Sequence, residues 1–409
     1  MMTSVKPSND SAPLVPDATA TDITSVGDAS TGRSASDTAL SIRCEPLQDA
    51  DHLLLCGWRH LADRSIEPNA FLSPDFVLPA ARHLAPAQTP LLIWGETSAG
   101  RVVGLGIFEA VAGSPRLPLP HLRSWQTIHT FLDGFLVEDG WARAFFNGFW
   151  DFVCQSEWHG VELLRCPADG RMASELNDAA GRIGVTVHTG RTWERALVKP
   201  REGGPEALAA ATSLRRARSL RRSWRLLERY GTPHVAFRRD AATISESTAT
   251  LLFLEDLGWK HRAGTSLAAN PQQKQFFEDL VARFAENNQI IFSELKVDAR
   301  TIASVVNLVS GGAAFAFKLG WDPQFERACP GYQLKAQTVV EGPTQLANLD
   351  FIDSCASPGS FIEHVWPERR SLCAPLFLAS RRSRAARHLV DAARTLRDFW
   401  RGSPSTEAK

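Results

Sequence analysis

Several features that would settle a protein's class are missing from this chain. Its seven cysteines include no C-x-x-C pair, which argues against a zinc site and against a disulfide scaffold. No run of about 18 apolar residues is present to cross a bilayer, and the amino terminus has no basic segment followed by an apolar one. We therefore expect a cytoplasmic protein that contains no metal.

The chain also has no formal net charge. The 409 residues include 45 basic and 45 acidic side chains, so the chain as a whole has no attraction to nucleic acid or to an anionic membrane. A charged substrate must therefore be bound by a local cluster of side chains. The length exceeds one typical hydrophobic core and predicts two domains of roughly 150 to 200 residues each.

The first half of the chain predicts a tail followed by one lobe. Residues 1–40 are rich in Ser, Thr, Ala, Asp and Pro with few large apolar side chains, so we expect a disordered tail. A first lobe is expected over 41–205, where Ser73 has the features of a helix N-cap and Pro74 those of a first helical residue. The strands expected in this lobe lie at 91–96, 102–111, 161–166 and 185–198.

The second half, 206–409, has clearer periodicity. It predicts a basic helix over 213–230 that ends at Gly231, a strand, two helices, and three strands joined by hairpin-length turns as an antiparallel meander. The segments expected in order are a strand at 234–238, helices at 244–260 and 272–286, strands at 290–297, 301–310 and 313–319, a helix opening at 330, strands at 348–355 and 372–379, and a closing helix at 383–401.

A turn suited to a phosphate follows the meander. Pro330 and Gly331 open a helix directly after strand-like runs, and the N–H groups of a first helical turn bind anions together with the positive end of the helix dipole. Gly331 can adopt backbone angles that are closed to residues with a Cβ, and Arg327 could bind the same anion. A plain helix start is the alternative interpretation.

This order of elements, over about residues 213–380, resembles the GNAT acetyltransferase superfamily. Three segments are similar to the acetyltransferases linked to cellulose biosynthesis (CelD/BcsL): the Arg-rich stretch 213–222, Leu-Gly-Trp-Lys-His-Arg-Ala at 257–263, and Pro330-Gly331. The resemblance implies an α/β (α+β) GNAT fold. The first half resembles a degenerate copy of the same unit, which implies two tandem lobes as in FemAB-type peptidyltransferases, with a substrate groove between them.

The resemblance also implies where the donor binds. In GNAT enzymes the third meander strand separates from its neighbour and offers backbone groups to the pantetheine of acetyl-coenzyme A or another acyl-coenzyme A. Phe317, Lys318 and Leu319 hold that position here. The turn departs from the family pattern of Gln or Arg, two variable residues, Gly, one variable residue, then Gly or Ala, because three residues separate Arg327 from Gly331.

Candidates for proton transfer are Asp353, His364 and Glu294. A general base needs a carboxylate or imidazole beside the acceptor; Asp353 and His364 lie in the segment that leads to the acyl group in this fold, and Glu294 lies in an apolar strand. A structural role is the alternative for each, and a chain of water molecules could replace a direct base. Tyr332, one of two tyrosines, is placed at the donor and could protonate the leaving thiolate, as a tyrosine does in many members of the superfamily.

The acceptor is expected beside Trp259, Lys260 and Arg262, which end the first helix of the domain. They could contact a sugar or an anion, or the basic residues could simply complement the helix dipole. The arginines of 213–230 and the helix at 383–401 favour a polyanionic acceptor or peripheral association with membrane polysaccharide machinery. A solvated structural helix is the alternative, and nucleic acid is not expected.

Together these observations predict a GNAT-type acyltransferase that moves an acyl group from acyl-coenzyme A to an amine or hydroxyl of a small-molecule or carbohydrate-related acceptor. A role in cellulose or exopolysaccharide synthesis is implied by the resemblance alone. Two other interpretations stay open: a FemAB-type aminoacyl transferase that uses charged transfer RNA, and an inactive accessory protein of polysaccharide assembly.

Overall fold

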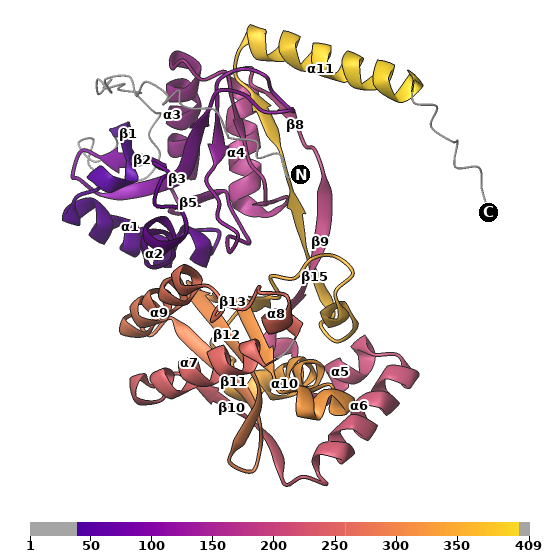
Figure 1. The fold of residues 1–409 in the computed structure, drawn as a ribbon. Helices are drawn as coiled ribbons and strands as arrows, with labels where there is room; N and C mark the ends of the chain where they lie inside the picture. The colour runs from indigo at the N-terminus through magenta and orange to yellow at the C-terminus, as the bar shows by residue number, and fades with distance from the viewer. Residues whose placement is uncertain (1–38, 258, 401–409) are drawn as a thin grey trace, which may run out of the picture.

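The protein folds into two lobes, each built on a mixed eight-stranded sheet (Figure 1). The computed structural model describes residues 39–257 and 259–400, so nearly all of the predicted tail lies outside the described residues. The first sheet has the order β1-β2-β3-β4-β6-β16-β8, and β5 also pairs with β3. Its strands are β1 Leu40–Pro46, β2 Leu91–Thr97, β3 Val102–Val111, β4 His121–Ser124, β5 Phe135–Val137, β6 Gly160–Glu162, β8 Thr186–His188 and β16 Leu376–Leu378.

The helices of the first lobe pack on its sheet, and particular residues determine where they begin and how closely they pack. Ser73 accepts a hydrogen bond from the N–H of Asp75 at 3.2 Å, with Pro74 at the first helical position, as predicted. Gly104 of β3 faces the Phe145 ring so closely that an added Cβ would lie 2.3 Å from it. The helices are α1 His52–Arg64, α2 Pro74–Leu84, α3 Ala142–Gln155 and α4 Gly170–Arg182, with single 3-10 turns at Leu47–Asp49 and Ala70–Leu72.

The second sheet has the order β10-β11-β12-β13-β14-β9-β15-β7. Its strands are β7 Cys166–Pro167, β9 Thr192–Val198, β10 Pro233–Arg238, β11 Ile290–Val297, β12 Arg300–Ser310, β13 Ala313–Trp321, β14 Phe351–Asp353 and β15 Glu368–Cys373. Its helices are α5 Pro205–Ala211, α6 Leu214–Leu227, α7 Ala241–Asp256, α8 Trp259–Arg262, α9 Pro271–Glu286 and α10 Pro330–Gln345, with 3-10 turns at Pro200–Glu202, Pro323–Ala328 and Phe361–His364. The predicted meander is confirmed: β10 to β13 pair antiparallel in sequence order.

The two lobes exchange strands, which corrects three expectations. The strand predicted at 161–166 is divided into β6, which belongs to the first sheet, and β7, which pairs with β15 in the second. The single strands predicted at 185–198 and 372–379 are each divided: β8 and β16 pair in the first sheet, and β9 and β15 pair in the second (Figure 1). The breaks have local causes. Gly190 adopts a φ of 70°, its hypothetical Cβ would lie 2.2 Å from the Ala374 carbonyl oxygen, and Pro375 beside it has no N–H to continue a ladder. Strands from both sides of residue 205 therefore contribute to each sheet.

The space between the lobes is filled by aromatic rings where we expected a substrate groove. Phe71 of the first lobe meets the ring of Phe315 of β13 at 5.6 Å between centroids, and Phe76 of α2 meets Phe276 of α9 at 5.7 Å. Both helices and the sheet face belong to one continuous hydrophobic core. The expectation of a groove is wrong at this place because edge-to-face rings close it.

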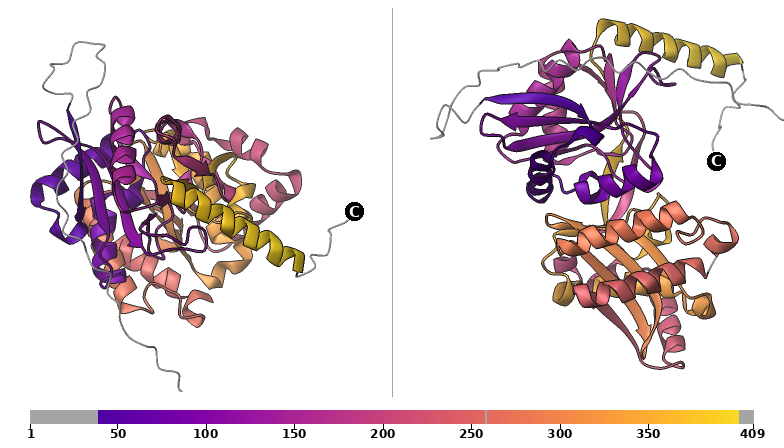
Figure 2. Two further views of the ribbon diagram at one scale, coloured as in Figure 1. Left: turned by 90° about the horizontal axis from the view of Figure 1, so that it is seen from above. Right: turned by 60° about the vertical axis from the view of Figure 1, so that its left-hand side comes forward.

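The last helix, α11 Arg381–Trp400, extends along the outer side of the first lobe (Figures 1 and 2). It follows β16 directly. Within the part of the chain that the structure describes, no helix combines the length and the apolar character needed to cross a membrane.

Candidate active site

The decisive feature of the second sheet is a gap beside β13, beyond the end of its parallel partner β14. β14 pairs with β13 only at Ala313, Ala314 and Phe315, although β13 continues to Trp321. On the other side of β13, Val306 faces Lys318 and Asn307 faces Ala316, so Phe317 is an extra residue. A bulge of this kind bends a strand and redirects its side chains. β14 ends at Asp353, opposite Phe315, so within the described residues no strand pairs with this side of β13 from Ala316 onward.

The residues predicted to contact pantetheine lie on this part of β13. Phe317 is buried in the core between the lobes, and its neighbour Lys318 reaches the first lobe, where its Nζ lies 3.0 Å from Nδ1 of His129. Leu319 is half-buried and lies below the first turn of α10, because a Cβ added to Gly331 would lie 3.2 Å from its Cδ2. The predicted segment and the predicted turn are thus brought together, while their roles stay predictions.

The turn before α10 differs from the expected geometry in one respect. The left-handed residue is Cys329, at φ 50° and ψ 57°, and Gly331 lies inside the helix at an ordinary negative φ. Gly331 is needed for a different reason: helix α10 packs so closely on β13 at this point that a side chain has little room. The expectation of unusual angles at Gly331 is therefore wrong, and close packing replaces it.

The turn has fewer backbone donors than a typical helix start. Pro330 has no N–H, the N–H of Cys329 donates to the Glu326 carbonyl at 2.9 Å, and the N–H of Tyr332 donates to the Cys329 carbonyl at 3.0 Å. Only the Gly331 N–H of this first turn has no hydrogen bond within the described structure. Most of the positive charge for a phosphate must therefore come from side chains.

Arginine side chains near the turn carry positive charge. Helix α6 packs on α10, where the Gln333 side-chain amide donates to the Leu220 carbonyl at 2.8 Å. Burial raises the pKa of the Tyr332 phenol, and Arg216 lies near enough to oppose part of that rise. Arg327 is exposed on the turn itself. The exposed arginines of α6 and its end make no side-chain ion pair or hydrogen bond with the described residues: Arg215, Arg216, Arg218, Arg221, Arg222, Arg225 and Arg229.

A buried lysine at the gap was missed by the sequence interpretation. Lys335, one turn into α10, is only 5% exposed, and within the described residues no carboxylate pairs with it. Its Nζ lies 4.8 Å from the centre of the Trp366 ring. It also interacts electrostatically with Cys355, two residues beyond the end of β14. Burial lowers the pKa of Lys335 to about 7, so a large fraction is neutral near physiological pH. Its position inside an otherwise apolar helix face was the available signal.

Asp353 lies in an ion-pair network at the strand crossing. It is fully buried on β14, lies 3.0 Å from Nη1 of Arg370 and 3.4 Å from Nη1 of Arg195, and accepts the Cys355 N–H at 2.8 Å. Arg370 also pairs with Glu67 of the first lobe. These contacts join the exchanged strands across both lobes. The geometry favours the structural alternative for Asp353 over proton transfer.

The other two candidates lie apart from it. Glu294 is buried on β11, accepts a hydrogen bond from the Ser247 hydroxyl at 2.7 Å, and lies 3.6 Å from Nζ of Lys296. Two strands separate β11 from β14, a spacing of roughly 14 Å. His364 is exposed at the end of the 3-10 turn Phe361–His364. The structure does not bring these three residues together.

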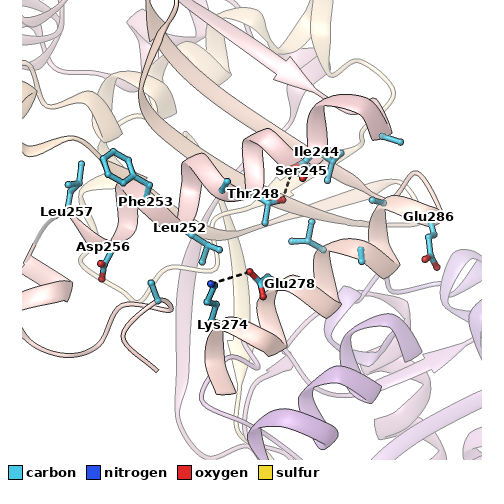
Figure 3. Close-up of a pocket in the computed structure, with 16 residues that line it drawn as sticks. Ile244, Ser245, Thr248, Leu252, Phe253, Asp256, Leu257, Lys274, Glu278 and Glu286 are labelled. Atoms are coloured by element: carbon cyan, nitrogen blue, oxygen red, sulfur yellow. Dashed lines mark hydrogen bonds and ion pairs between the residues drawn. The ribbon is translucent and has the colours of Figure 1, made fainter. Parts of the chain in front are cut away.

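An open groove lies between α7 and α9, near the predicted acceptor residues. It has a volume of about 760 Å³ and is lined by apolar side chains such as Leu252 and Val281, with Asp256 at one end (Figure 3). Lys274 and Glu278 form an ion pair of 3.7 Å on its rim. The side chains of Trp259 and Lys260 lie outside the described structure, and Arg262 on α8 is exposed. A groove of this kind is open to an acceptor from the solvent side.

No group of three His, Cys, Asp or Glu side chains is placed to hold a metal ion among the described residues. The gap, the turn and the arginines therefore make up the candidate site. From the sequence we expected a donor site at the segment 317–319 and at the turn, whereas the arginines of α6 were considered for an acceptor or a membrane surface.

Comparison with known proteins agrees with this geometry. Residues 214–345 match the acetyltransferase (GNAT) domain family. Within the second lobe, this segment is a GNAT-type acetyltransferase domain. The match begins at the first residue of α6 and ends at the last residue of α10, so it contains the arginine helix, the meander, the turn and Lys335. It identifies the chain as an enzyme of the GNAT acyltransferase type.

Solved structures extend the likeness to both lobes. The chain is similar to FemX, with a TM-score of 0.51 and 10% identity over 80% of this chain and 96% of that one. It is similar to a conserved protein of unknown function from Bacteroides thetaiotaomicron, with a TM-score of 0.50 and 10% identity over 79% and 97% of the two chains. At this identity the likeness shows the fold alone. No curated protein sequence matches the chain.

Proposed function

We propose that this protein transfers an acyl group from acyl-coenzyme A to an amine or hydroxyl of a carbohydrate-related acceptor. The observation that carries the proposal is that β13 loses its partner β14 after Phe315, with the start of α10 packed against β13 beyond that point, at Leu319. A thioester is already activated for transfer, so the protein needs to position it, polarise its carbonyl and accept a proton. The carbohydrate class and a role in polysaccharide synthesis rest on the sequence resemblance to the cellulose-linked acetyltransferases.

Each part of the donor site has a task in this proposal. The Gly331 N–H and the guanidinium groups of Arg216 and Arg327 bind the pyrophosphate, because charge-assisted bonds from arginine replace the missing backbone donors. The backbone of β13 between Phe317 and Leu319 borders the gap that accepts the pantetheine arm. The residues present fit such a ligand, since the side of β13 facing β14 is left by its strand partner from Ala316 on.

Lys335 is the group we assign to proton transfer. A neutral amine beside the gap can take the proton that the attacking amine or hydroxyl loses as the new bond to the acyl carbon forms. The same proton can return to the sulfur as the carbon–sulfur bond breaks, so the step needs no further reactant. A base works best when its pKa is near the working pH, and the burial of Lys335 provides this. Trp366 holds the amine in place.

The test is titration calorimetry of the full chain with acetyl-coenzyme A. We expect binding to be lost in Gly331→Trp, because the indole would fill the space between the turn and Leu319. Gly181→Trp on α4 is the matched control, since a Cβ added to Gly181 would meet no atom within 4 Å. Circular dichroism must show that Gly331→Trp is folded. No binding by the folded wild type would refute the proposal.

Aminoacyl transfer from charged transfer RNA is the second candidate. The observation in its favour is the row of unpaired arginines on α6 next to the turn, because such a surface suits a polyanion. Filter binding of a charged transfer RNA, compared with acetyl-coenzyme A in the same buffer, separates the two. Tight, salt-sensitive binding of the RNA together with no binding of the coenzyme would favour the second candidate. An inactive accessory protein would bind neither.

A further inference from the structure

Helix α11 is attached to the first lobe along one side only. Arg384 donates to the Gly184 carbonyl at 3.3 Å, Arg387 to the Arg116 carbonyl at 3.2 Å, and Arg394 to the Pro115 carbonyl at 2.9 Å. Ser383 at its start is fully buried. The views in Figures 1 and 2 agree that the helix lies on the outside of the first lobe, far from α6 and α10.

The opposite side of α11 presents apolar side chains to solvent. Leu389 is 72% exposed and Leu396 is 59% exposed. Ala385 and Ala392 are also exposed, and the spacings of four, three and four residues place all of them on one stripe of the helix. Large exposed leucines aligned in this way are uncommon for a helix that meets only water, so the stripe indicates a contact surface.

Basic groups border this stripe. Arg381, Arg382 and His388 are exposed beside it. Asp391 is the acidic side chain described on this helix, and it is engaged by Arg387, whose Nε lies 3.0 Å from its Oδ2. The rim of the stripe is therefore positive. A surface that complements it must combine an apolar layer with negative charge.

We propose that α11 docks this protein on the surface of an anionic lipid bilayer, with the Leu389 and Leu396 side chains between the head groups. An amphipathic helix with leucines on one face and arginines at its borders lies in the plane of such an interface. A second copy of the chain is a poorer occupant, because pairing of two such stripes places the positive rims against each other. This inference is independent of the acyl-transfer proposal, which concerns the other lobe.

Vesicle co-sedimentation of the full chain tests the proposal. Wild-type protein should sediment with phosphatidylcholine vesicles that contain phosphatidylglycerol and stay in the supernatant with phosphatidylcholine alone. The double substitution Leu389→Gln and Leu396→Gln should weaken binding by about tenfold or more, because two inserted side chains are lost. The double substitution Arg381→Gln and Arg382→Gln should also weaken vesicle binding. The loss should be larger at low salt than at high salt, because salt already screens the attraction between the arginines and the lipid head groups.

The matched control is the double substitution Leu53→Gln and Leu214→Gln, because each of these leucines is 79% exposed on another helix. It should bind vesicles as the wild type does. Equal loss in the control, or no sedimentation of the wild type with anionic vesicles, would overturn the proposal. A dimer in sedimentation velocity that Leu389→Gln and Leu396→Gln dissolves, without vesicle binding, would overturn it in favour of a second copy.

Discussion

The two lobes differ at the end of the third strand of the meander. In the second lobe β14 leaves β13 after three residues and the gap is bordered by α10. In the first lobe the strand that corresponds to β13 is interrupted and forms two short strands, β4 and β5, which both pair with β3. Of these two, β4 is the one that pairs in parallel with β6, at Leu122 and Arg123. The loop between β4 and β5 is hydrogen-bonded to the residues that follow β6. Asp133 fixes this loop, and its Oδ2 accepts hydrogen bonds from Ser124, Gln126, Leu164 and Arg165.

The turns before the matching helices also differ in charge. Before α10 the chain has Arg327 next to Glu326, with the arginines of α6 on a neighbouring helix, whereas before α3 it has Glu138 and Asp139. Asp139 is paired with Arg171 at 2.6 Å, and Glu138 lies 3.5 Å from Arg101. Carboxylates at a helix start repel a phosphate that the N–H groups would otherwise attract. Under the proposed function, one lobe binds the donor and the other serves as a scaffold, and these local residues account for the difference.

The largest expected effect comes from opening the closed gap of the first lobe. Asp133→Ala would leave buried donors on Ser124, Gln126 and two backbone N–H groups without an acceptor, so we expect a loss of about 3 to 5 kcal/mol in the free energy of unfolding. Urea titration followed by tryptophan fluorescence measures it. Asp178→Ala, at an exposed position of α4, is the control and should change stability by less than about 0.5 kcal/mol.

A smaller loss than this would mean that the loop does not depend on Asp133. The gap of the first lobe would then be closed by apolar packing alone, and the contrast between the lobes would rest on the charge of the turns.

Local patterns in the sequence predicted most of the second lobe. The meander, the basic helix and the start of a helix at Pro330 follow from alternation, arginine spacing and the N1 preference of proline. The strand exchange could not be predicted in this way, because the alternation of 185–198 and 372–379 is the same whether a strand stays in one sheet or crosses to another. The breaks occur where Gly190 meets Ala374, the residue before Pro375, and such a contact between distant parts of the chain cannot be seen in local alternation.

The site shows the same limit. Arg327 and Gly331 were found from the turn motif, and the missing N–H of Pro330 is plain from the sequence. The engagement of the Cys329 and Tyr332 N–H groups could be seen only from the hydrogen bonds of the folded chain. Asp353 has the residue type of a base, and its arginine partners lie on strands that are distant in sequence, at Arg195 and Arg370. Lys335 was passed over because a lysine on a helix is usually exposed. Its burial is a product of packing against Trp366.

Helix α10 buries the amine of Lys335, whereas the matching helix α3 buries phenylalanine rings. Replacing Lys335 with an apolar residue tests what this difference does to stability. The pKa of Lys335 is lowered from 10.5 to about 7. Below pH 7 the folded chain must bury a charge, and between pH 7 and 10.5 it binds fewer protons than the unfolded chain, so its stability rises with pH. We expect Lys335→Met to raise the free energy of unfolding by about 2 to 4 kcal/mol at pH 6 and by little at pH 10.

The same variant tests the assigned proton transfer. In the wild type, kcat should rise with pH through an apparent pKa near 7 as the amine of Lys335 becomes neutral. In Lys335→Met this limb should disappear and kcat should fall, while the affinity for acetyl-coenzyme A measured by calorimetry stays within about threefold, since uniform binding is not removed. A pH profile that keeps its limb in the variant would show that another group accepts the proton.

The smallest expected effect concerns the charge around the two turns. Reversing Arg216 and Arg327 to Glu should weaken the binding of acetyl-coenzyme A by about tenfold to a hundredfold, because two charge-assisted contacts become repulsive. Both residues are exposed, so folding should be unaffected. Asp139→Lys in the first lobe is the matched change of sign at the other turn and should leave the affinity unchanged. If Asp139→Lys instead alters the affinity as much as the arginine reversals do, the charges act through the field of the whole molecule, and the contrast between the lobes is not local.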